Sequence, residues 1–147
     1  MPADADPIEL AARALQHRDR SRRQLDERLA RAGVDDAGRA EALETLERVG
    51  YLDDGRYARA RAASLAERGY GDEGIRELLQ RDGVEPGAAA EALATLQPER
   101  DRAAALVARL GPGSKTAAHL GRKGFGEDAV EAAARGVLGD EVGGDAD

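Results

Sequence analysis

An internal repeat constrains the fold of this chain more than any other feature of its sequence. The segment from Arg31 to Leu46 recurs from Arg81 to Leu96 at an offset of 50 residues, with an arginine, a glycine–valine pair and an Ala-Glu-Ala-Leu run in register. A weaker third copy follows at 122–125. A repeat period of about 50 residues is typical of small units that bury their apolar faces by packing in series.

The apolar residues between the glycines and prolines fall at helical spacing. The first stretch follows one helix face at positions i, i+3, i+4 and i+7: Ile8, Ala11, Ala12 and Leu15. Ser21 with Gln24 has the pattern of a capping box, and Asp35 and Ser114 are the expected N-caps of later helices. We therefore predict an all-α fold with helices at 8–17, 21–32, 35–49, 54–68, 72–82, 86–96, 99–110, 114–123 and 127–138.

These helices group three to a repeat. The expected domain organisation is an elongated array, free to curve, of three tandem three-helix repeats at 8–52, 53–97 and 98–138. The two ends, 1–7 and 139–147, are rich in aspartate or glycine and short of apolar residues, so we expect both to be disordered tails.

The composition excludes several classes of function. The chain has no cysteine, so it can form no disulfide framework, thiolate nucleophile or cysteine-ligated metal site. Its net charge of -7 argues against coating nucleic acid by bulk attraction. The sequence holds no signal peptide and no run of ~18 apolar residues, so we expect a cytoplasmic protein without a membrane segment.

The residue types that usually serve in catalytic sites do not occur here in catalytic patterns. His17 and His119 are far apart in the sequence and lack metal-ligand spacing. The segment 111–116 resembles a phosphate-binding loop, but it lacks the GxxxxGK[ST] order and a preceding strand. Most carboxylates alternate with arginines on exposed helix faces. We therefore expect no catalytic, cofactor or metal site, and we expect that the protein is not an enzyme.

A basic segment stands out between Arg13 and Arg31. It holds seven arginines against three acidic residues, a local balance of +4 in an acidic chain. Part of it is a ladder of charge pairs along one helix face, since Glu27 stands four residues before Arg31. The candidates for contact with a phosphate or carboxylate are the arginines around the loop and helix start: Arg18, Arg20, Arg22 and Arg23.

A second candidate surface is one edge of the array. An arginine stands two residues before the glycine of each repeat, and a lysine follows it in the third: Arg31, Arg81, Arg122 and Lys123. These side chains could equally interact with the dipole at their own helix C-terminus. Sequence-specific reading of DNA by a helix-turn-helix is disfavoured, because the expected recognition helix at 35–49 is acidic.

One motif resembles a known family. The nine residues 50–58, Gly-Tyr-Leu-Asp-Asp-Gly-Arg-Tyr-Ala, resemble the GYLDDxRFA signature of the RecX family of recombinase regulators, with Tyr57 for the usual phenylalanine. Three other segments resemble family pieces in the same order: 18–25, 67–78 and 120–125.

The resemblance implies a small, monomeric, all-helical protein with three repeats. Such a protein binds the RecA filament along its groove and restrains filament extension, ATPase activity, strand exchange and repressor cleavage in homologous recombination and the SOS response. Weak contact with single- or double-stranded DNA is also implied, and the basic segment could provide it.

The signature also has a structural interpretation. We expect Gly50 to end a helix in the left-handed conformation, and Tyr51 and Leu52 to pack back on their repeat. Asp53 or Asp54 would cap the next helix. That helix would present two further signature residues, Arg56 and Tyr57.

Two other functions remain open. Three-helix units with a Gly-Phe loop, here Gly124 and Phe125, resemble ubiquitin-associated peptide binders, so the chain could be a general protein-interaction module. Autonomous DNA binding by the basic segment is the other alternative, and it predicts a steep dependence of affinity on salt.

Overall fold

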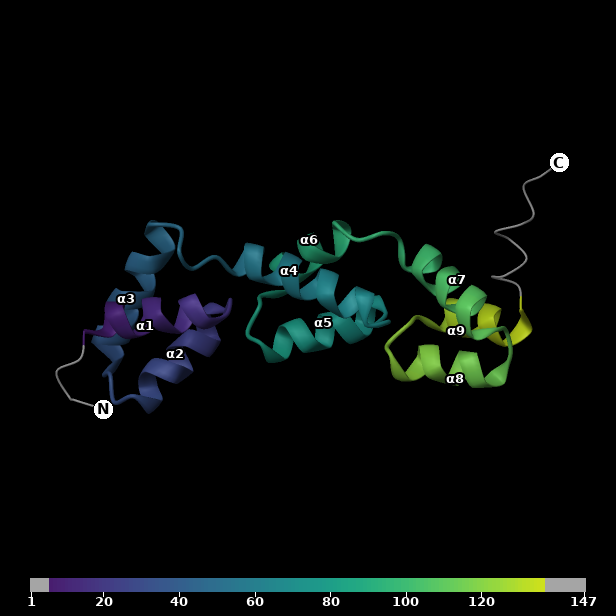
Figure 1. The fold of residues 1–147 in the computed structure, drawn as a ribbon, viewed down its shortest axis with the longest axis horizontal. Helices are drawn as coiled ribbons and strands as arrows, with labels where there is room; N and C mark the ends of the chain where they lie inside the picture. The colour runs from purple at the N-terminus through teal and green to yellow at the C-terminus, as the bar shows by residue number, and fades with distance from the viewer. Residues whose placement is uncertain (1–5, 137–147) are drawn as a thin grey trace.

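The computed structural model describes residues 6–136, which form nine α-helices and no strand. The helices are α1 (Pro7–His17), α2 (Arg22–Arg31), α3 (Asp36–Arg48), α4 (Asp54–Glu67), α5 (Asp72–Arg81), α6 (Pro86–Ala94), α7 (Glu99–Leu110), α8 (Ser114–Arg122) and α9 (Glu127–Arg135). They lie in an elongated row of three groups (Figure 1). The predicted all-α repeat fold is confirmed.

Each group of three helices has its own core. We call α1–α3 unit 1, α4–α6 unit 2 and α7–α9 unit 3. The buried side chains form three separate clusters, one in each unit, built mainly from leucine and alanine. Burying one leucine contributes about 1.5–3 kcal/mol. Since the main helix packing also lies within units, the stability of each unit comes chiefly from its own small core.

Local capping marks several of the helix ends. Ser21 and Gln24 form the predicted capping box at α2, and the Asp35 carboxylate accepts the Gly38 N–H at α3. Gly50 lies at φ +85, in the left-handed region, directly after α3. These predictions are confirmed.

The helix ends lie within one residue of the sequence prediction except at the C-termini of α6 and α9, which end earlier, at Ala94 and Arg135, and the cap predicted at Ser114 is wrong. Ser114 is the first residue of α8 and Gly113 occupies the N-cap, so Ser114 caps nothing. Helix α1 begins at Pro7, whose fixed φ suits the first helical position. Helix α9 ends at Arg135 because Gly136 is left-handed. The predicted tails fall mostly outside the described residues.

The middle helices of the three units lie end to end along one side of the row (Figure 1). At the first junction, between units 1 and 2, Ser21 at the start of α2 donates its hydroxyl to the Asp82 carbonyl at the end of α5. At the second junction, between units 2 and 3, the Gly71 N–H at the start of α5 donates to the Lys123 carbonyl at the end of α8, at 2.8 Å. The repeats are therefore joined through equivalent helix ends.

Candidate functional site

The signature segment 50–58 connects unit 1 to unit 2. The Asp53 carboxylate caps α4 by accepting the Arg56 N–H at 3.0 Å, and this bond holds the pKa of Asp53 below its usual value. The Arg56 guanidinium reaches back to the carbonyls of Gly50 and Tyr51, both at 3.0 Å. Asp54 accepts the N–H of Arg22 at 2.7 Å, across the first junction. The polar residues of the motif therefore lie at the connection between two units and make hydrogen bonds on both sides of it.

The two apolar signature residues after Gly50 differ in burial. Leu52 is 2% exposed in the core of unit 1, as expected, but Tyr51 is 65% exposed. The expectation that Tyr51 packs on its unit is therefore wrong. After Gly83 and Gly124 the next residue is buried, whereas after Gly50 the burial shifts by one position to Leu52. Both Tyr51 and Leu52 donate their N–H to the Leu46 carbonyl.

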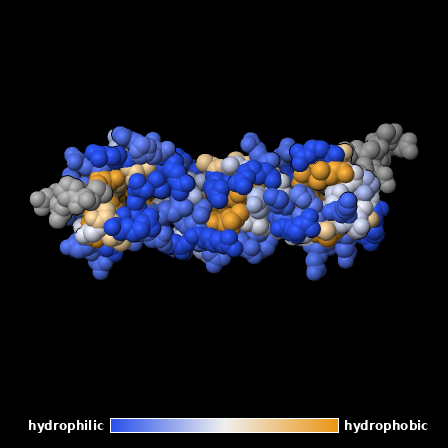
Figure 2. Space-filling model, turned by 60° about the horizontal axis from the view of Figure 1, so that its bottom comes forward, coloured by the Kyte–Doolittle hydropathy of each residue, from blue (hydrophilic) through white to orange (hydrophobic). Residues whose placement is uncertain are grey.

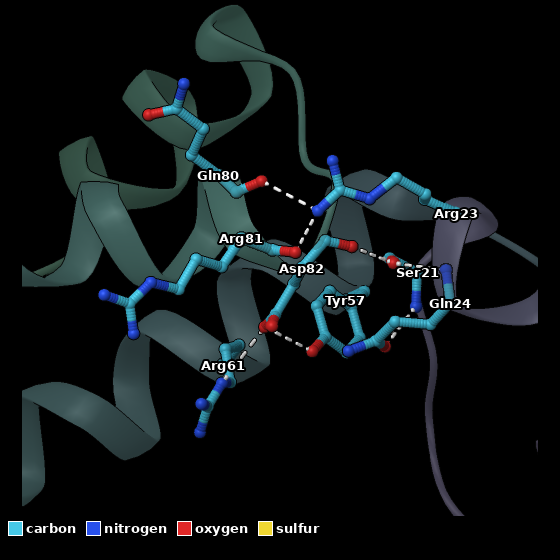
Figure 3. A network of polar contacts seen from close by, with 8 residues as sticks. All are labelled: Ser21, Arg23, Gln24, Tyr57, Arg61, Gln80, Arg81 and Asp82. Atoms are coloured by element: carbon cyan, nitrogen blue, oxygen red, sulfur yellow. Dashed lines mark hydrogen bonds and ion pairs between the residues drawn. The ribbon is translucent and has the colours of Figure 1, made fainter. Parts of the chain in front are cut away.

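Tyr57 lies beside the first junction. Its ring is 8% exposed, and its hydroxyl donates to the Asp82 carboxylate at 2.6 Å (Figure 3). Arg61 donates to the same carboxylate at 3.3 Å. Burial, and then the hydrogen bond to Asp82, raise the pKa of Tyr57 to about 12. The Asp82 carbonyl also accepts a hydrogen bond from the Ser21 hydroxyl. Asp82 therefore connects the core of unit 2 to the start of α2.

Two of the predicted contact arginines have partners within the chain. The Arg22 guanidinium pairs with Glu47 at 2.8 Å. Arg23 crosses the first junction and donates to the carbonyls of Gln80, at 3.2 Å, and Arg81 (Figure 3). The structure thus places Arg22 and Arg23 in the packing of the array.

Two of the other candidates lie together with further arginines on unit 1. Arg20 donates to the Ala14 carbonyl at 3.2 Å. Its pKa is lowered, first by burial and then by the nearby charges of Arg28, Arg18 and Arg31. We call Arg18, Arg20, Arg28 and Arg31 the arginine cluster. Within residues 6–136 none of the four is paired with a carboxylate.

Arg28 is a member of this cluster that the sequence did not indicate. It lies on α2, whereas Arg20 lies in the loop between α1 and α2, so their proximity depends on the tertiary packing of unit 1. A phosphate or carboxylate bound beside Arg20 would relieve the repulsion from the three neighbouring guanidinium charges, so this surface is suited to an anion.

The predicted edge of three arginines is only partly formed. Arg81 and Arg122 both line a hollow of about 490 Å³ between α5 and α8, whereas Arg31 belongs to the arginine cluster of unit 1. The Lys123 ammonium lies 4.2 Å from the centre of the Tyr70 ring, in cation–π contact. Lys123 therefore has a structural contact at the second junction.

The described surface carries no other obvious site. Figure 2 shows a mostly hydrophilic face with separate hydrophobic areas over each third of the molecule. Among residues 6–136 no three histidine, aspartate or glutamate side chains converge in a way that could hold a metal ion. None of the described helices combines the length and apolar character needed to cross a bilayer.

Comparisons with known proteins point to one family. A family model described as RecX, second three-helix domain, matches residues 53–93. A Regulatory protein RecX from Halorhodospira halophila is 36% identical over 134 residues, covering 84% of this chain and 83% of that protein. Another of the same name, from Acidithiobacillus ferrooxidans, is 42% identical over 84 residues, and there the match covers 57% of this chain and only 56% of the relative.

Solved structures show the same fold. The crystal structure of RecX from Lactobacillus salivarius superposes with a TM-score of 0.76 at 18% identity, covering 89% of this chain and 94% of that one. A second, described as regulatory protein RecX, gives a TM-score of 0.71 at 20% identity, covering 88% and 73%. At these identities the likeness concerns the fold alone.

Proposed function

Because the chain belongs to the RecX family of regulatory proteins, we propose that it binds RecA recombinase filaments and restrains their extension, ATPase activity and strand exchange. The process affected would be homologous recombination and the SOS response. The chain would act as a cytoplasmic monomer and catalyse no reaction itself. The observation that carries this proposal is a family match that runs along nearly the whole chain.

The shape of the molecule supports the proposal. An elongated row of small units offers a long surface to a partner that is itself extended, as solenoid proteins do. We assign the first contact to the arginine cluster, Arg18, Arg20, Arg28 and Arg31, since these side chains have no acidic partner among the described residues. They would bind carboxylates of the filament protein or phosphates of its DNA.

A titration of RecA's DNA-dependent ATPase tests this function. The wild-type chain should inhibit it, and a variant with Arg18→Glu, Arg28→Glu and Arg31→Glu should need a roughly tenfold higher concentration, equivalent to ~1.4 kcal/mol. All three side chains are exposed, so helicity should be unchanged. A matched control makes the same charge change at exposed arginines of units 2 and 3: Arg59→Glu, Arg109→Glu and Arg135→Glu.

The outcomes separate the contact from the function. Equal inhibition by the variant and the control would remove the arginine cluster from the contact surface. A wild-type chain that leaves the ATPase unchanged would contradict the function itself.

The two alternatives receive less support. Phe125 of the Gly-Phe loop is only 6% exposed, in the core of unit 3, so the loop does not offer its ring to a peptide. Autonomous DNA binding has one favourable observation, the arginine cluster, and we propose at most weak DNA contact. DNA affinity that is tight at physiological salt without RecA would favour this alternative instead.

A further inference from the structure

The two junctions between units use the same helix ends but different chemistry. In both, a carboxylate at the first position of the following unit's first helix accepts the first N–H of a middle helix. Asp54 accepts from Arg22 at 2.7 Å in the first junction, and Glu99 accepts from Asp72 at 3.0 Å in the second. The remaining contacts differ, and they decide how stiff each junction is.

The second junction joins backbone to backbone. The Gly71 N–H donates to the Lys123 carbonyl at 2.8 Å, and the Glu73 N–H donates to the Gly124 carbonyl at 3.2 Å. Gly74 and Gly124 permit this approach, since a Cβ on Gly124 would lie 2.2 Å from the Gly74 nitrogen. Backbone groups in direct contact have no side-chain torsion through which the units could move.

A second helix of unit 3, α7, also contacts the N-terminal turn of α5. Arg102 on α7 donates to the Tyr70 carbonyl at 2.9 Å and pairs with the Asp72 carboxylate, and its side chain is only 10% exposed. Units 2 and 3 are thus held through both α7 and α8, which fixes the angle between them.

The first junction lacks this direct backbone contact among the described residues. Within the described residues, no backbone–backbone hydrogen bond joins unit 1 to unit 2. Its polar contacts all run through side chains: the Ser21 hydroxyl, the Asp54 carboxylate, the half-exposed Arg23 guanidinium, the Gln24 amide beside Tyr57, and the Arg56 guanidinium on the connecting segment. Gly83 approaches the side chain of Arg23 there, not a backbone. Tyr57, which occupies the position on α4 that Arg102 occupies on α7, donates to Asp82 of its own unit and meets unit 1 through the Gln24 side chain.

We propose that unit 1 swings as an arm about the first junction, while units 2 and 3 move as one rigid body. Each contact that resists the swing includes a side chain with rotatable torsions, and the longest of them, Arg23, is open to competing water. The motion carries the arginine cluster relative to the rest of the array. The inference itself concerns the isolated chain, and only its use in filament binding rests on the proposed function.

Spin-label distance measurements on the full chain test this proposal. The chain has no cysteine, so pairs can be introduced at exposed helix positions without background labelling. Ala30→Cys with Ala63→Cys reports the first junction, and Ala63→Cys with Ala118→Cys reports the second. We expect the first distance distribution to be about twice as wide as the second.

Substitutions assign the width to the named contacts. Arg23→Ala should widen the first distribution and leave the second unchanged. Arg102→Ala should widen the second distribution and leave the first unchanged. Arg28→Ala, on the same helix as Arg23 but outside the junction, is the matched control and should change neither. Circular dichroism confirms that each variant is folded. Equal widths in the parent pairs, or no response to Arg23→Ala, would overturn the proposal.

Amide hydrogen exchange on the unmodified chain gives an independent reading. The amides of Gly71 and Glu73 donate across the second junction, so their exchange reports its opening. We expect both to exchange more slowly than the Arg22 amide, which donates across the first. Exchange at Gly71 and Glu73 as fast as at Arg22 would contradict a rigid second junction. A fault in the proposed function would leave all these measurements unaffected.

Discussion

Tyr57→Phe isolates the hydrogen bond that Tyr57 makes beside the first junction. The substitution removes only a hydroxyl that donates to the Asp82 carboxylate at 2.6 Å, and the buried ring remains. A hydrogen bond to a charged group contributes ~1.5–3 kcal/mol. Asp82 keeps its bond from Arg61 at 3.3 Å, so the carboxylate is not orphaned. We therefore expect the free energy of unfolding to fall by about 1–2 kcal/mol.

The burial of Tyr57, together with its bond to Asp82, also predicts that the stability depends on pH. The pKa of Tyr57 is about 12 in the folded chain, against ~10 for an unperturbed tyrosine. Because the folded-state pKa is the higher one, the stabilisation is complete below the unfolded value and is lost as the pH rises through the folded value. The difference in stability between wild type and Tyr57→Phe should therefore be constant near neutral pH and shrink at alkaline pH.

Urea unfolding followed by circular dichroism measures both effects. The m-values of the two proteins should agree, so that the midpoint shift reports stability alone. Tyr51→Phe is the matched control, since the Tyr51 side chain is exposed and its loss of a hydroxyl should change nothing. A difference below ~0.5 kcal/mol at neutral pH, or one that persists undiminished at alkaline pH, would refute the reasoning.

Two further pairs of substitutions follow from the packing. Leu52→Ala should lower the free energy of unfolding by ~2–5 kcal/mol, because the side chain is buried in unit 1, whereas Tyr51→Ala should change it by less than ~0.5 kcal/mol. Gly124→Ala should destabilise by more than ~1 kcal/mol, since the residue lies at φ +84 against the backbone of α5, while Gly87→Ala in open space on α6 should stabilise slightly. Thermal unfolding of the four variants checks both contrasts, and equal effects within either pair would contradict it.

Local signals explain why most of the fold could be predicted. The capping box at Ser21, the cap at Asp35 and the left-handed Gly50 are all decided within a few residues of chain. The sequence signal at Ser114 is ambiguous, because a serine at the start of a helix can be its first residue when a glycine occupies the cap. The separation into three cores follows from the repeat itself.

The candidate site could be predicted only in part, because its chemistry depends on contacts between distant segments. Nothing near Arg23 in the sequence indicates that it reaches the end of α5, 57 residues away. Arg18, Arg20 and Arg31 were recognised as basic, but their convergence with Arg28 depends on the tertiary packing of unit 1. Counting charges along the sequence identifies a basic segment. It does not show which of its arginines find an acidic or carbonyl partner in the folded chain.

The signature motif takes part in the packing between units 1 and 2. Asp53 caps α4, Asp54 and Arg56 hold the connection between units, and Tyr57 bonds to Asp82, so these four side chains have partners inside the molecule. We infer that these residues affect a partner chiefly by setting where unit 1 lies relative to units 2 and 3. Direct contact has to come from side chains outside this network, and the arginine cluster and the exposed ring of Tyr51 meet that condition.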